Sequence, residues 1–142
     1  MNSAILAPAA ALVLWSLLML LWMAVTRFAG MAKLGVDIRT APPGGRGKDL
    51  ETMLPPDVNW KSHNYTHLME QPTIFYATVM ILALAGQGTG LNLTLAWAYV
   101  GLRIVHSLWQ STVNTIPVRF SLFVVSTVCL LVLAVNALRA TF

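Results

Sequence analysis

Four long apolar stretches, separated by polar connections, dominate the chain. A helix that crosses a bilayer needs about 20 mostly apolar residues, and each stretch is long enough. The pattern therefore predicts an all-α fold: an integral membrane four-helix bundle that forms one four-span domain over residues 1–142. The predicted spans cover about residues 5–28, 63–85, 91–114 and 117–138.

The connections between these stretches predict the orientation. The first, residues 31–61, is long and polar, and its PPGGRG and LPPD motifs cannot continue a helix. This loop carries five basic residues, whereas the second connection and the N-terminal tail carry none. Since Lys and Arg collect on the cytoplasmic side of membrane proteins, we expect loop 31–61 to be cytoplasmic and both termini to face outward. Arg139, near the C-terminus, runs against this pattern.

Composition narrows the class of protein. Apolar residues make up 57% of the chain and charged residues only 10%, against about 25% charged in soluble domains. A single cysteine, Cys129, cannot form an internal disulfide bond. The net charge of +4 arises mostly in the loops, so we expect no nucleic-acid partner. The prediction is a multi-pass integral protein of a bacterial inner membrane, with the lipid bilayer as its surroundings.

Ionisable side chains within the predicted spans are the candidates for function, because a charge in a bilayer is costly. Each of two spans carries three polar residues at a spacing that places them on one helix face. A rise of about 1.5 Å per residue brings the two faces to similar depth. We therefore expect them to meet in one enclosed, cation-rich cavity that opens toward the cytosol. These residues are His63, His67 and Glu70 in the second span, and Arg103, His106 and Gln110 in the third.

Two structural interpretations stand beside the functional one. Glu70 and Arg103 could form a buried ion pair that only stabilises the bundle. Arg119 could be a headgroup-level anchor, which is the usual role of an Arg at the end of a span. Alternatively, Arg119 follows Pro117 at the start of a helix, where free N–H groups and the helix dipole favour an anion.

Over its whole length, the chain resembles the MAPEG superfamily, the membrane-associated proteins in eicosanoid and glutathione metabolism. Members of that family carry Arg, Asn and Glu in the second helix, at the same spacing as His63, His67 and Glu70 in this chain. They also carry an Arg with His or Tyr three residues later in the third helix, and an Arg that opens the fourth. The matching residues are His63, His67, Glu70, Arg103, His106 and Arg119.

The resemblance implies a homotrimer that binds glutathione as cosubstrate between subunits, near the cytoplasmic face. It implies a glutathione-dependent transferase or peroxidase acting on a lipophilic substrate. Arg119 would be the catalytic residue that stabilises the thiolate. The sequence departs from the family at four positions of the implied glutathione site, where His63, His67, Gln71 and Gln110 replace Arg, Asn, Tyr and Tyr.

Other functions fit parts of the same pattern. His63 and His67 at a spacing of four residues, with Glu70 and His106, are Zn or Fe ligands by residue type. Zinc proteases with this spacing have a Glu directly after the first His, where this chain has Asn64, and we predict no metal site. The alternative is a non-catalytic membrane subunit of a larger complex, which could dock through loop 31–61.

Overall fold

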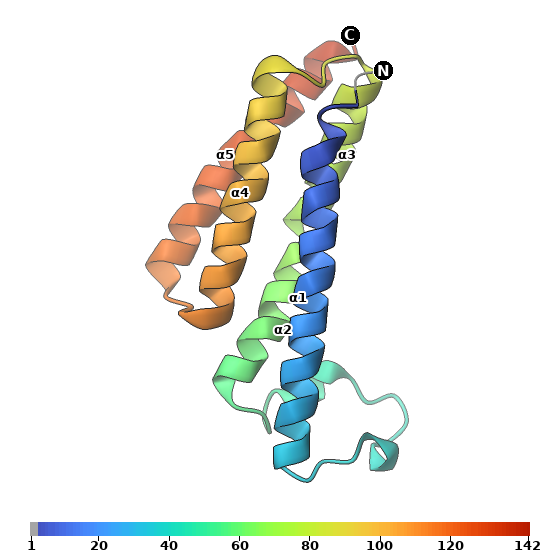
Figure 1. Ribbon diagram of the computed structural model, residues 1–142, viewed down its shortest axis with the longest axis vertical. Helices are drawn as coiled ribbons and strands as arrows, with labels where there is room; N and C mark the ends of the chain where they lie inside the picture. Colours follow the sequence, from blue (N-terminus) through green and yellow to red (C-terminus); the bar gives the residue numbers. More distant parts are fainter. Residues whose placement is uncertain (1–2) are drawn as a thin grey trace.

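A computed structural model describes residues 3–142 of the chain, and the described part is all-helical, without strands. Figure 1 shows the long helices running side by side in a bundle. Both termini lie at one end, and the loop that follows α1 lies at the other. The five α-helices are α1 (Leu6–Lys33), α2 (Pro56–Leu68), α3 (Gln71–Leu84), α4 (Gly90–Thr112) and α5 (Ile116–Ala140).

Three of these helices follow the predicted spans. α1, α4 and α5 match the first, third and fourth apolar stretches, and α1 runs five residues further than expected, to Lys33. Among the described residues, α1 and α5 are the two helices that are both long and apolar enough to cross a membrane. α4 has the length but carries a row of buried polar residues. The expectation of four spans therefore remains a prediction.

The second predicted span is wrong as a continuous helix. α2 ends at Leu68 and α3 begins at Gln71, with Met69 and Glu70 between them. Pro72 lies in the first turn of α3, where its missing N–H is tolerated but where it cannot extend a preceding helix. α2 also begins earlier than expected, at Pro56, so part of the predicted loop is helical.

The loop after α1 contains two short 3-10 helices, η1 (Ile38–Thr40) and η2 (Gly47–Leu50). Asp37 caps η1 and forms an exposed ion pair with Arg39 at 2.9 Å. η2 lies close to the Arg27 side chain of α1. A Cβ added to Gly47 would be only 2.5 Å from a guanidinium nitrogen of Arg27. Glycine thus allows this loop to approach α1 closely.

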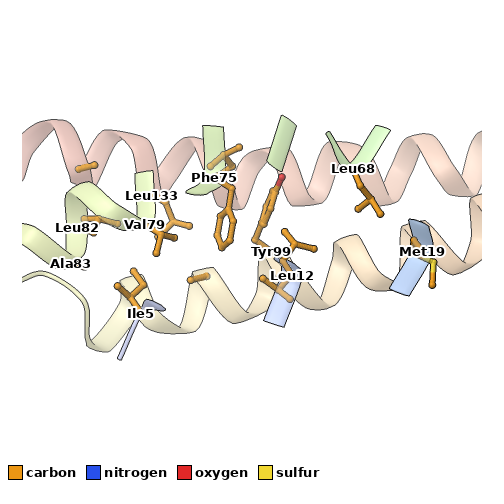
Figure 2. Close-up of a cluster of buried hydrophobic side chains, with 14 residues drawn as sticks. Ile5, Leu12, Met19, Leu68, Phe75, Val79, Leu82, Ala83, Tyr99 and Leu133 are labelled. Carbon is orange, nitrogen blue, oxygen red and sulfur yellow. The ribbon is translucent and has the colours of Figure 1, made fainter. Parts of the chain in front are cut away.

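An apolar core fills the half of the bundle near the termini. Figure 2 shows the side chains of this cluster, among them Ile5, Leu12, Val79 and Leu82, converging between the helices. The rings of Phe75 and Tyr99 stack with centroids 4.4 Å apart, a separation at which aromatic pairs gain more than area burial alone.

A polar bridge joins three helices beside this core. The Tyr99 hydroxyl of α4 donates to the Gln71 side-chain oxygen of α3 at 3.1 Å. The Gln71 amide in turn donates to the Thr127 hydroxyl of α5 at 2.9 Å. Gln71, a predicted site residue, is therefore engaged in holding helices together at the point where α3 begins.

Candidate functional site

His67, in the last turn of α2, is the centre of the polar cluster in the loop half of the bundle. Its Nδ1 lies 3.2 Å from a carboxylate oxygen of Glu70. Its Nε2 lies 3.4 Å from a guanidinium nitrogen of Arg103. Its ring is also 4.8 Å from that of His106 and 5.6 Å from that of Phe123. Residues of four segments thus meet at one imidazole.

The ion pair considered between Glu70 and Arg103 is not present in the described structure. Glu70 pairs with His67 instead, and its side chain is 64% exposed. The cause is the helix break, because Glu70 lies beyond the end of α2 and does not continue the face of His63 and His67. The i, i+4, i+7 alignment of the three residues is therefore wrong for Glu70.

Arg103 is the most deeply buried charge of the cluster. Its relative exposure is 0%, and no carboxylate lies within ion-pair distance of it among residues 3–142. Two long contacts, both to His67, are its hydrogen bonds in this part of the chain, and its Nε has no partner there. A buried guanidinium without a counter-charge is costly unless an anion compensates it.

A polar cleft lies on one side of His67. It has a volume of about 510 Å³, within the range of about 300–1,000 Å³ typical of ligand sites. α1, η2, α2 and α4 all contribute to it. The side chains that matter for charge and hydrogen bonding are Arg27, Lys48, Glu51, His63, His67, Glu70 and Gln110.

A smaller, aromatic cleft of about 160 Å³ lies on the other side of His67. It is lined by His67 and His106 together with four residues of α5, namely Ile116, Arg119, Phe120 and Phe123. The expectation of one enclosed cavity is therefore wrong in form. The polar faces do converge, but they border two open clefts that share the imidazole of His67.

Arg119 reaches the aromatic cleft from the first turn of α5. Its guanidinium donates to the side-chain oxygen of Asn114, in the turn between α4 and α5. Asn114 has a left-handed backbone with φ of 58°, a conformation that asparagine tolerates better than most residues. With α5 starting after this turn, Arg119 of α5 and His106 of α4 line the same cleft.

The remaining candidates occupy different positions. His63 is half exposed and lies 3.1 Å from Glu51 of the loop. Gln110 is 7% exposed, and its side-chain oxygen has no partner in the described part of the chain. Gln71 lines neither cleft, since it belongs to the bridge with Tyr99 described above.

Sequence reasoning missed Arg27. This residue donates to the Ser62 hydroxyl at 2.7 Å and lines the polar cleft. In the sequence it stands at the end of the first apolar stretch, where an Arg is usually a headgroup anchor. The sequence could have indicated Arg27 as a site residue, because Arg27 precedes loop 31–61 and His63 follows it, which places both at the same end of the bundle.

Within residues 3–142, no group of three or more His, Cys, Asp or Glu side chains is placed to hold a metal ion. The two imidazoles that come closest, His67 and His106, face each other at 4.8 Å with Arg103 beside them, and a nearby guanidinium disfavours a bound cation.

The helical bundle, two helices long and apolar enough to cross a membrane, and a buried basic cluster indicate an all-helical membrane protein with a candidate anion-binding site. The sequence profile of the MAPEG family matches residues 5–139, and the chain belongs to this family. The family comprises membrane proteins related to glutathione and eicosanoid metabolism, and its members generally use glutathione. No curated protein and no solved structure matches the chain significantly.

Proposed function

We propose that this protein is a glutathione-dependent transferase or peroxidase that acts on a lipophilic substrate. The observation that carries the proposal is Arg103, a fully buried guanidinium with no carboxylate partner among the described residues. Arg103 contacts His67, which lines both clefts. Arg103 itself lines neither cleft, so an anion bound against His67 would compensate the buried charge through space.

The polar cleft suits the charges of the tripeptide, which has two carboxylates, one ammonium group and one thiol. Arg27 and Lys48 can donate hydrogen bonds to the carboxylates, and charged hydrogen bonds of this kind are about twice as strong as neutral ones. Glu70, exposed and facing the same cleft, can accept the ammonium group. Gln110 adds a buried amide oxygen that still needs a donor.

The aromatic cleft suits the second substrate. Phe120 and Phe123 give it an apolar wall, and Phe120 is 64% exposed toward the surroundings of the bundle, from which a lipophilic molecule would enter. Arg119 is the catalytic residue in this proposal, because its guanidinium can hold a thiolate next to that wall. The thiol proton leaves to solvent, the sulfur bonds to the electrophilic carbon, and the leaving group departs with the bonding electrons.

We further propose that the protein works as a homotrimer with both termini outward, as its family resemblance implies. Only 17% of the residues in the most apolar stretch of α1, and likewise of α5, are buried within the single chain. Neighbouring copies and lipid can cover these faces. The two termini lie at one end of the bundle and the basic loop at the other, consistent with the expected orientation.

The test is calorimetric titration of glutathione into the detergent-purified full chain. We expect binding to the wild type and weaker binding to Glu70→Ala, whereas Arg39→Ala, which removes an exposed loop arginine, serves as the matched control and binds normally. For Arg119→Ala we expect unchanged binding, but turnover of an aromatic electrophile about 100-fold to 1,000-fold lower. If the wild type fails to bind millimolar glutathione, the transferase proposal is wrong and the non-catalytic subunit becomes the better hypothesis.

A further inference from the structure

A second polar cavity lies at the opposite end of the bundle, near both termini. It has a volume of about 440 Å³ and lies between the start of α4 and the end of α5. Figure 1 shows these two helix ends side by side, far from the loop that follows α1. Its polar lining residues are Gln87, Thr89, Asn92, Asn136 and Arg139. The proposed transferase site does not involve this cavity.

Hydrogen bonds hold the walls of this cavity in place. The Asn136 amide of α5 donates to the Asn92 side-chain oxygen of α4 at 2.7 Å. The Asn92 amide donates to the backbone carbonyl of Gln87 at 2.9 Å. Asn92 is 9% exposed. The end of α5, the start of α4 and the preceding turn therefore form one rigid frame around the cavity.

Arg139 gives the cavity a positive charge, and no acidic side chain among the described lining residues offsets it. Arg139 is exposed and forms no hydrogen bond or ion pair within the described part of the chain. No Asp or Glu follows Glu70 in the sequence, so no acidic side chain of α3, α4 or α5 can neutralise it. Gln87 and Thr89 place an amide and a hydroxyl at the same cavity.

The surroundings of the cavity are apolar. Leu91 is 64% exposed and Leu138 is 59% exposed, and they adjoin the polar lining in the sequence. Arg139 is also the basic residue that departs from the predicted charge asymmetry, because it lies at the end with the termini. The preference of basic residues for the cytoplasmic side therefore does not account for Arg139.

We propose that this cavity binds a phosphate group, and specifically the headgroup phosphate of an anionic phospholipid. Arg139 pairs with the phosphate oxygens, since a planar guanidinium matches phosphate geometry. Gln87 and Thr89 donate further hydrogen bonds, and the acyl chains lie along the exposed leucines. A soluble phosphate ester would satisfy the polar lining alone, and the experiment must separate the two sources.

The experiment measures ligand affinity by native mass spectrometry of the detergent-purified full chain. The probes are phosphatidylglycerol, diacylglycerol, which lacks the phosphate, and glycerol phosphate, which lacks the acyl chains. We expect phosphatidylglycerol to bind, diacylglycerol to bind at least tenfold more weakly, and Arg139→Gln to lower phosphatidylglycerol affinity at least tenfold. Arg139→Lys, which keeps the charge, should retain most of the affinity.

Lys33→Gln is the matched control, because it removes an exposed cation at the other end of the bundle. It should leave phosphatidylglycerol affinity unchanged. Equal affinity for phosphatidylglycerol and glycerol phosphate would keep the phosphate site but assign it to a soluble ester. Wild-type affinity in Arg139→Gln, or equal binding of diacylglycerol, would overturn the proposal.

Discussion

The two halves of the bundle bury their side chains in opposite ways. In the half near the termini, apolar residues such as Phe75, Val79 and Leu133 are fully buried against one another. The polar side chains of the buried Tyr99 and the half-buried Gln71 both have partners there. In the loop half, Arg103, Gln110 and Asn64 are buried with polar atoms that lack partners in the described structure.

This difference suggests that the half near the termini stabilises the fold and that the loop half binds a ligand. A satisfied apolar core gives one well-defined packing, whereas unpartnered buried polar groups cost free energy unless something binds to them. The loop half is therefore the part of the molecule that is incomplete by itself. The clefts on both sides of His67 lie in that half.

The largest expected effect on stability is in the half near the termini. Phe75→Ala removes a side chain with 0% exposure that stacks on Tyr99. Such truncations cost about 3–5 kcal/mol in soluble cores, and the packing share of that cost persists in a bilayer. We expect a loss of at least about 2 kcal/mol, measured by unfolding in mixed micelles. Ile74→Ala, on the exposed side of α3, should change stability little; equal losses in both variants would contradict the contrast.

The second prediction concerns Arg103→Met in the loop half. Replacing a buried, unpaired charge by an apolar side chain of similar length is often neutral or stabilising. We expect unchanged or higher stability together with at least a tenfold loss of glutathione affinity, measured by unfolding and calorimetry on the same samples. A large loss of stability would show that Arg103 is structural and would remove the contrast between the halves.

The smallest effect is expected in the loop itself. The side-chain hydrogen bond from Arg39 holds the pKa of Asp37 below its ordinary value of 3.8. The ion pair therefore stabilises the folded state above that value, and the contribution disappears as the pH falls through the lowered pKa. Because the pair is exposed to solvent, Arg39→Ala should change the unfolding midpoint only slightly at neutral pH and not at all in strong acid.

The sequence predicted the class of fold well, because apolar length is a strong signal. Three of its four apolar stretches became single helices, and the family resemblance was confirmed over residues 5–139. The sequence predicted one span over residues 63–85, whereas the helix is broken at Met69 and Glu70. The local sequence shows that a proline disturbs a helix, but tertiary packing decides where the helix ends.

The candidate site was predictable in residue type but not in pairing. Helical spacing brought His67, Arg103 and His106 together as expected. The spacing rule suggested Arg103 as the partner of Glu70, whereas Glu70 pairs with His67, because the rule assumes an unbroken helix. Arg27 could not be found from spacing within one helix, because it reaches the polar cleft from α1, across the bundle.

The interruption between α2 and α3 has a consequence for how this protein can change over time. Two separate helices do not share a rotational phase, so a substitution on α2 need not propagate as a twist into the packed residues of α3. Side chains around His67 can therefore vary while the apolar half keeps its architecture. Substitutions among the thirteen residues of α2 could thus alter the lining of the polar cleft and leave the helices of the apolar half in place.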